Sequence, residues 1–337
     1  MVSLESYSQE MILAGIRDGG LTGMGGAGFP THKKYETDKS IDSLLINGAE
    51  CEPFLTCDYR LMLEQGYGIL NGICLLLKAS GARKAYLCIE DNKPEAIRSL
   101  RRILEAAKQS GKIEETQKLE IRELPAKYPQ GGERTLIYAV TGREINSSML
   151  PADAGCIVDN VETICSIYDA VALGRPIMKR IFTVTGKGIN RPAHFEVCTG
   201  TDMAELIDAA GGLKEHAGKV ISGGPMMGFA MYDLHVPCVK TSSSLLCMQS
   251  DPVSDAKEEE TACINCGRCV SVCPGHVIPA RLATFAQRGD MESFQKFDGM
   301  ECCECGCCSY ICPAKRPLTQ SIKSMRKMVL AERKKKK

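Results

Sequence analysis

Two matching cysteine runs in the last quarter of the chain constrain its fold more than any other feature. The first run has the spacing Cys-x2-Cys-x2-Cys-x3-Cys-Pro and consists of Cys263, Cys266, Cys269 and Cys273. The later stretch MECCECGCCSYICP repeats this spacing in one register, because a run that starts at Cys303 meets glycine at position 306. The second run is therefore Cys302, Cys305, Cys308 and Cys312.

This spacing is typical of domains that bind two [4Fe-4S] clusters, in which the fourth cysteine of each run binds the other cluster. We predict that the first cluster, cluster I, is bound by Cys263, Cys266, Cys269 and Cys312. The second cluster, cluster II, is predicted on Cys302, Cys305, Cys308 and Cys273. Zinc is the alternative, but zinc sites usually combine two separated Cys-x2-Cys pairs. Two clusters in one small domain indicate one-electron transfer.

Composition limits the remaining possibilities. A chain of 337 residues suggests two or three domains. The net charge of +1 gives no reason to expect nucleic-acid binding. No apolar run reaches the roughly 18 residues of a membrane span, and the first 20 residues lack the features of a signal peptide. Nineteen cysteines without a secretion signal favour metal ligands and buried free thiols in a reducing compartment.

The first half of the chain alternates between strand and helix patterns. We predict strands at 41–48, 84–90 and 118–124 and helices at 57–79, 94–110, 132–142 and 159–173. This order indicates an α/β domain with a parallel sheet. From about 177 the pattern changes to a small α+β unit. The predicted domains are 1–176, 177–252 and 253–325, followed by a basic tail at 326–337.

A second candidate site is the glycine-rich stretch GLTGMGGAGFPTHKKY, residues 20–35. Glycine lets the backbone approach a flat or phosphorylated ligand, but a glycine-rich loop is also a common turn. Three polar segments accompany it: INGAECEPFLTCDYR directly after a strand, YPQGGERTLIYAVTGRE and DNVETI at helix starts. Ligands of open α/β sheets bind beyond the carboxyl ends of the strands. Within these segments, Asp58 and Arg60 are expected to pair at a helix start.

In this order, GMGGAGFPT, NGAECEP, GGERTLI and DNVET resemble the flavin-binding subunit of respiratory complex I. With the two cysteine runs, residues 15–325 are similar to the C-subunit family of the Rnf ferredoxin:NAD oxidoreductases, without the N-terminal domain that those subunits usually carry. The resemblance implies an FMN-binding α/β domain, a soluble-ligand-binding β-grasp (SLBB) domain and a helical dicluster ferredoxin domain.

The resemblance also implies which residues bind cofactors. The glycine loop would wrap FMN and the nucleotide phosphates through Gly23, Gly25, Gly26, Ala27 and Gly28. Phe29 would lie near the dinucleotide and Lys34 near a phosphate. The isoalloxazine would be lined by Asn47, Glu50 and Cys51, and the far side of FMN by Asn160 and Thr163. Glu133 would lie near the nicotinamide, and Gly132 would be a further cofactor-binding residue. Met24 and Arg134 depart from complex I, which has arginine and an acidic residue there.

The implied function is that of an oxidoreductase and translocase subunit. It would exchange electrons between NAD(H), FMN and two [4Fe-4S] clusters, on the cytoplasmic face of the cell membrane. Its partners would be other Rnf-type subunits, including integral membrane ones and an iron–sulfur subunit, and ferredoxin. One alternative is a soluble NADH-dependent reductase of the cobalamin or proline-reductase type. Another is a non-enzymatic iron–sulfur relay that binds no flavin.

The cysteine register makes a direct prediction. Cys303 and Cys307 fall outside the register and are expected to be buried small side chains beside the cluster. Cys303→Ser and Cys307→Ser should each keep about eight irons per chain, the content of two four-iron clusters. Cys305→Ser should lose iron. Iron and sulfide analysis of the reconstituted proteins measures this, and iron loss in Cys303→Ser would show that the register is wrong.

Overall fold

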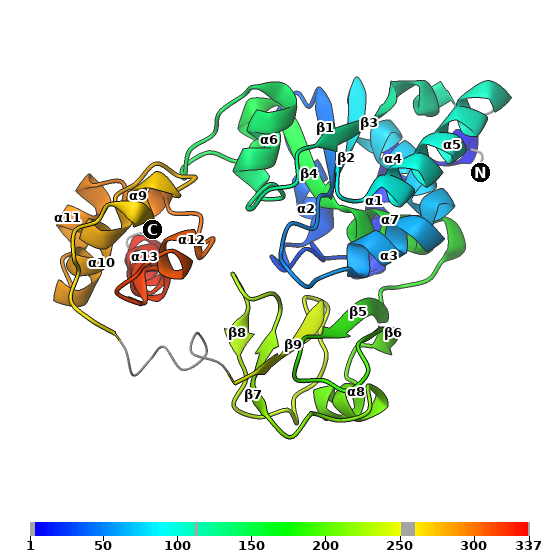
Figure 1. Ribbon diagram of the computed structural model, residues 1–337. Coiled ribbons are helices and arrows are strands. Elements are labelled where there is room, and N and C mark those ends of the chain that lie inside the picture. Colours follow the sequence, from blue (N-terminus) through cyan, green and yellow to red (C-terminus); the bar gives the residue numbers. More distant parts are fainter. Residues whose placement is uncertain (1–3, 112–113, 251–259, 336–337) are drawn as a thin grey trace.

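The computed structural model describes residues 4–111, 114–250 and 260–335. Figure 1 shows three folded units that follow one another along the chain. The first carries a four-stranded sheet and the second a five-stranded sheet, whereas the third is helical. We call them the first, second and third domains. The predicted boundary between 252 and 253 lies outside the described residues.

The sheet of the first domain is parallel throughout, with strand order β3-β2-β1-β4. The middles of its central strands consist of buried apolar residues, 44–46 in β1 and 87–89 in β2, as expected for a sheet that is covered on both faces. The strands are β1 (Ser43–Gly48), β2 (Lys84–Glu90), β3 (Leu119–Leu124) and β4 (Cys156–Asn160). All four carboxyl ends therefore meet at one edge of the sheet.

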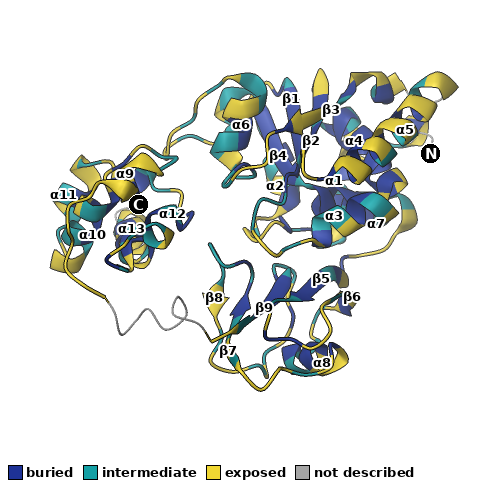
Figure 2. Ribbon diagram, in the orientation of Figure 1, coloured by how far each residue is buried: buried dark blue, intermediate teal, exposed yellow. Residues whose placement is uncertain are grey.

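Helices cover the two faces of this sheet unequally. The larger core packs against one face and includes the apolar sides of α1 (Gln9–Asp18), α3 (Cys57–Glu64), α4 (Gly66–Ser80), α5 (Pro94–Ser110) and α7 (Val161–Leu173). A smaller core lies beneath α6 (Glu133–Thr141) on the other face. The short elements are α2 (Thr31–Tyr35), η1 (Leu4–Ser6), η2 (Glu114–Lys118) and η3 (Pro151–Ala154). Figure 2 shows the buried strands between exposed helix surfaces.

Two elements of this domain differ from the sequence-based prediction. The expected helix at 57–79 is two helices, because the chain turns at Gln65 and brings Gly66 against the side chains of α5. The strand β4 was not predicted, since its five residues directly precede a helix and carry no turn signal between the two elements. The predicted strands at 41–48, 84–90 and 118–124 match β1, β2 and β3 to within two residues.

The second domain is a mixed sheet with strand order β6-β5-β9-β7-β8 and one helix. Strands β5 and β9 pair in parallel, and the other pairs are antiparallel. Its core surrounds the fully buried Phe182. The elements are β5 (Lys179–Thr185), β6 (Ala193–Cys198), α8 (Met203–Ala209), β7 (Ala217–Ser222), β8 (Phe229–Ala230) and β9 (Ser244–Gln249). Asp202 caps α8, its side chain accepting from the backbone N–H of Ala204.

The third domain packs short helices around the buried Phe294 and Ile322. Its elements are α9 (Arg268–Ser271), α10 (Pro279–Arg288), α11 (Met291–Lys296), η5 (Gly299–Glu301), α12 (Cys307–Tyr310) and α13 (Leu318–Lys335). The predicted tail begins inside α13, and its last two residues lie outside the described part of the chain. None of the helices described is both long and apolar enough to cross a bilayer.

A buried ion pair fastens the second domain to the first. Arg180 on β5 and Glu162 in the first turn of α7 are 2% and 5% exposed, and Arg180 Nη2 lies 2.6 Å from Glu162 Oε2. Arg180 Nε donates to the other carboxylate oxygen at 3.0 Å, which makes the pair bidentate. The remaining donors of Arg180 bind the carbonyls of Met24 and Lys240. A buried pair with this many partners is costly to break.

We therefore expect Arg180→Met to lower the free energy of unfolding by about 3–5 kcal/mol, because the Glu162 carboxylate stays buried without its partner. Urea unfolding followed by circular dichroism measures the change. The adjacent pair Lys179–Glu196 is exposed and serves as a matched control. Lys179→Met should barely move the midpoint, and an equal shift in both variants would contradict a special role for the buried pair.

Candidate cofactor site

Two asparagines mark the carboxyl edge of the sheet. Asn47 and Asn160 are register partners at the ends of β1 and β4. Asn160 is the N-cap of α7, and its side-chain oxygen accepts from the backbone N–H of Glu162 at 2.9 Å. Its amide donates to Asp58 at 2.6 Å. The predicted residue Thr163 lies fully buried in the same first turn of α7.

The glycine loop lies over this helix start. Its turn is closed by the hydrogen bonds Gly23 N to Phe29 O, 2.8 Å, and Gly28 N to Gly23 O, 3.0 Å. The Met24 N–H donates to Thr163 Oγ1 at 3.0 Å, so the loop is fixed to α7. Of the predicted loop residues, the exposed ones are Gly25, Gly26, Ala27 and Phe29. The exposed backbone of the loop therefore lies beside the carboxyl edge of the sheet, where Asn47 and Asn160 are found.

Side chains of the second domain form hydrogen bonds with the backbone of the glycine loop. Lys240 Nζ donates to the Gly20 carbonyl at 2.6 Å, and Arg180 binds the Met24 carbonyl at 3.0 Å. Gly28 has φ +65°, and a Cβ there would lie 2.9 Å from Thr241. Glycine is therefore required at 28 for both its backbone conformation and its close contact. The loop is shaped by residues between 156 and 220 positions away in the sequence.

A third segment, residues 128–133, closes the opposite side of the site. The Asn47 amide donates to the Gly131 carbonyl at 2.9 Å, and the Gly131 N–H lies 3.3 Å from Cys51 Sγ. Gly132 is the N-cap of α6, and Glu133 is its first residue. Partial enclosure of its carboxyl group raises the pKa of Glu133. The structure thus brings four predicted residues together on this side: Asn47, Cys51, Gly132 and Glu133.

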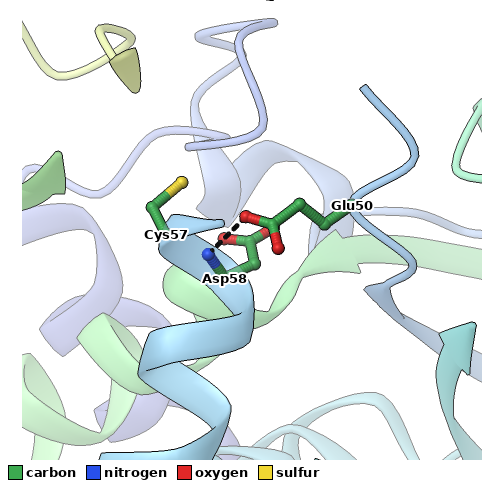
Figure 3. A group of neighbouring side chains, drawn as sticks. All are labelled: Glu50, Cys57 and Asp58. Carbon is green, nitrogen blue, oxygen red and sulfur yellow. Dashed lines mark hydrogen bonds between the residues drawn. The ribbon is translucent and has the colours of Figure 1, made fainter. Parts of the chain in front are cut away.

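Figure 3 shows an acidic cluster at the start of α3. Glu50 has φ +46° and accepts from the backbone N–H groups of Asp58, 2.7 Å, and Tyr59, 3.0 Å, so that it caps the helix. Each of Glu50, Cys57 and Asp58 offers one oxygen or sulfur atom that could bind a metal ion, and these atoms lie within 4.8 Å of one another. Burial raises the pKa of Asp58 well above its usual range, and burial likewise raises that of Glu50. These carboxyl groups therefore keep their protons to a higher pH than they would in water.

Lys34 is engaged inside the first domain. Its ammonium donates to Asp159 Oδ1 and to the Val158 carbonyl, both at 2.7 Å. Asp159 also accepts from the Tyr35 hydroxyl at 2.6 Å. Burial raises the pKa of Tyr35 well above its usual range. Two of the three donors of Lys34 are thus used within the protein, and its predicted contact with a phosphate stays a prediction.

In the third domain, the four cysteines predicted for cluster I line one cavity of about 170 Å³. They come from the loop before α9, from α9 itself and from the end of the second run: Cys263, Cys266, Cys269 and Cys312. The crossed pattern, in which Cys312 joins the first run, fits a cubane bound by thiolates. Cys263 and Cys266 are exposed, so this cavity opens at the surface.

The cysteines predicted for cluster II lie deeper. Cys305 and Cys308 are buried, whereas Cys302 and Cys273 are half-buried. Burial raises the pKa of Cys302 to about 12. The expectation that the out-of-register cysteines are buried is wrong, since Cys303 is exposed and Cys307 is half-buried. Within the second run, only the predicted ligands Cys305 and Cys308 are buried cysteines.

The sequence-based assignments missed several residues of the site. The expected pair of Asp58 and Arg60 is wrong, because Asp58 binds Asn160 and Arg60 pairs with Glu64 one helical turn later. Lys93, which is 6% exposed, binds the Ala49 carbonyl at 2.6 Å and was not singled out. The contacts of Asp58 with Asn160 and of Lys93 with Ala49 join segments far apart in sequence and have no local signal. The pair of Arg60 and Glu64 lies within α3 at i,i+4 spacing, which the sequence does show.

Comparison with known proteins agrees with this architecture. The family model of the Nuo51 FMN-binding domain matches residues 16–169. The SLBB domain matches residues 181–230, and a 4Fe-4S binding domain matches residues 257–278. Fold and site together define a flavin- and iron–sulfur-binding electron-transfer protein with an α/β domain, an SLBB domain and a ferredoxin domain.

Curated relatives show the family. The chain is 43% identical over 325 residues to the C subunit of the proton-translocating ferredoxin:NAD(+) oxidoreductase complex of Clostridium ljungdahlii, covering 96% of this chain and 68% of that protein. It is 41% identical over 335 residues to the C subunit of the Na(+)-translocating complex of Acetobacterium woodii, covering 99% and 73%. The chain belongs to the C-subunit family of ion-translocating ferredoxin:NAD(+) oxidoreductase complexes.

Solved structures share the fold at low sequence identity. A chain of the NAD+-reducing [NiFe]-hydrogenase in the H2-reduced state superimposes with a TM-score of 0.70 and 21% identity, covering 96% of this chain and 61% of that one. The air-oxidised state gives a TM-score of 0.63 and 24% identity, covering 86% and 54%. The three-domain arrangement thus occurs in another protein.

The acidic cluster predicts an unusual pH dependence of stability. A carboxyl whose folded pKa is raised binds its proton more tightly in the native state, so stability falls as pH rises from about 4 towards the folded pKa. Asp58→Asn keeps an oxygen that can accept from the Asn160 amide but removes the titrating carboxyl. The variant should therefore not lose stability in this way as the pH rises. We expect its urea midpoint to exceed that of the unsubstituted protein at pH 7 and to match it near pH 4.

The exposed carboxyl of Asp18 provides the control, because Asp18→Asn removes a charge that is not buried. Its midpoint should follow the unsubstituted protein at both pH values. A lower midpoint for Asp58→Asn at pH 7 would show that the Asp58 carboxylate is charged and stabilising, which is incompatible with a raised pKa.

Proposed function

We propose that this chain transfers electrons between NAD(H) bound at the carboxyl edge of the first domain and an external protein partner, through FMN and the two clusters. Bound FMN supplies the exchange between hydride transfer and single electrons, and the clusters carry single electrons. The chain itself orients these groups. Its glycine loop and residues 131–133 would enclose the flavin, and the third domain would hold cluster II next to it.

One observation carries this proposal. The Tyr128 hydroxyl donates to the carbonyl of Cys305, a predicted cluster II ligand, at 2.7 Å. Tyr128 begins the same segment in which Gly131 contacts Asn47 and Cys51, two residues predicted to line the flavin. The predicted ligands of cluster II would therefore lie close to the predicted flavin site. This proximity supports the flavin–cluster II–cluster I order and opposes a relay without flavin.

Cluster I would be the outer end of the path. Its cavity is bordered by Ile264, Val270 and Ile278, whose side chains are between 42% and 64% exposed. The described residues of the third domain, 260–335, carry 12 lysines and arginines against seven aspartates and glutamates. An apolar rim on a basic domain fits an acidic electron-transfer protein such as a ferredoxin.

The relatives named above belong to ion-translocating complexes. We propose the same setting for this chain, with integral membrane subunits and an iron–sulfur subunit as partners and with a peripheral position on the cytoplasmic face of the membrane. A reductase that feeds a different acceptor is the second candidate. Co-purification with integral membrane subunits after tagging the chain in its host would support the first, and recovery without them would favour the second.

The electron path is tested by reconstituting the protein with iron, sulfide and FMN. We expect NADH to bleach the flavin and to reduce viologen. Cys305→Ser should keep NADH-dependent bleaching and lose most viologen reduction, by roughly tenfold or more, because cluster II is interrupted. Cys198→Ser, which alters an exposed cysteine on the second domain, is the control. A protein that neither retains flavin nor reacts with NADH would leave only the relay.

A further inference from the structure

We propose that Arg134, Ser147 and Tyr128 form a latch that positions the cluster II loop, residues 301–307, against the flavin site. The inference rests on the proposed function, because it concerns the step between flavin and cluster II. None of the three residues is among those predicted to bind a cluster, FMN or NAD(H). Each comes from the first domain and binds the third domain directly before or within the cysteine run.

The first half of the latch holds Glu301, the residue before the ligand Cys302. Arg134 Nη1 donates to Glu301 Oε2 at 2.8 Å. The Ser147 backbone N–H donates to both carboxylate oxygens, at 3.1 and 3.0 Å, and the Ser147 hydroxyl donates to Oε1. Arg134 and Glu301 are 31% and 29% exposed, so water screens this pair only in part. One carboxylate thus receives donors from two separate segments of the first domain.

The second half holds the middle of the loop. The Tyr128 hydroxyl donates to the Cys305 carbonyl. The next residue, Gly306, has φ +84°, and a Cβ there would lie 2.6 Å from the carbonyl oxygen of Met226 in the second domain. Met226 and its neighbour Met227 in turn donate their N–H groups to Glu52, at 3.2 and 2.8 Å. The cluster II loop therefore contacts both the first and the second domain.

Two of the latch residues, Arg134 and Tyr128, lie close in sequence to predicted flavin and nucleotide residues. Arg134 follows Glu133 in the first turn of α6, and Tyr128 lies four residues before Gly132. The start of α6 and the segment before it would thus approach both the flavin site and the cluster II loop. Since electron transfer slows steeply with distance, a loop that swings away from these segments would be a poor acceptor. This geometry is what we expect of positioning residues.

The test compares the double variant Arg134→Gln/Tyr128→Phe with the unsubstituted, reconstituted protein. Stopped-flow absorbance follows flavin bleaching by NADH and the later reduction of the clusters. We expect bleaching to keep its rate and cluster reduction to slow by about tenfold. Iron and flavin contents should stay unchanged. Arg101→Gln, which removes an ion pair of 3.1 Å on the far part of the first domain, is the matched control.

Hydrogen exchange gives a readout that does not depend on turnover. The Ser147 amide donates to Glu301, so its exchange, measured by mass spectrometry on peptides that cover 144–150, should accelerate in Arg134→Gln and more strongly in Glu301→Gln. Arg101→Gln should leave it unchanged. Unaltered Ser147 exchange in both variants would overturn the latch, even if the protein did not react with NADH and the proposed function itself failed.

The kinetic outcomes are equally decisive. Cluster reduction at the original rate, together with faster Ser147 exchange, would show that the contacts exist but do not position the loop for electron transfer. Slower flavin bleaching in the double variant would assign Arg134 or Tyr128 to the nucleotide site and overturn their role as positioning residues. Slower cluster reduction with unchanged bleaching would support it.

Discussion

The buried pair of Arg180 and Glu162 is the interaction on which the arrangement of the first two domains depends. Glu162 belongs to the helix whose first turn contacts the glycine loop, and Arg180 reaches from the second domain to the carbonyl of Met24 in that loop. Removing either charge would leave the other buried, and removing Arg180 would also release the Met24 carbonyl. The cofactor site of the first domain is thus completed by the second.

The same principle applies where the third domain meets the other two. The segment after β3 presents Gly131 towards Asn47 and Tyr128 towards Cys305. Glu52, two residues after Glu50, holds the second-domain turn on which Gly306 packs. Tyr128 and Gly131, three residues apart, therefore contact different predicted cofactor sites. In the proposed function, this short segment would fix the spacing between the flavin and cluster II.

The sequence was informative wherever the pattern was local. The cysteine spacing defined the run that forms the cluster I cavity, including Cys312 from the second run, because the spacing reflects how a backbone wraps a cubane. Strands β1, β2 and β3 followed from short apolar segments between turn signals. Strand β4 and the break at Gln65 were missed, since both depend on packing against other elements rather than on local propensity.

The amino-acid sequence by itself determined the order of domains, the parallel α/β unit and the grouping of the cysteines. Only the tertiary structure decided which side chains meet across domains: Arg180 with Glu162, Arg134 with Glu301, and Tyr128 with Cys305. The physical reason is separation along the chain. Spacing and periodicity report on neighbours within a few residues, whereas an ion pair or a hydrogen bond between distant segments forms only after the cores have fixed both partners.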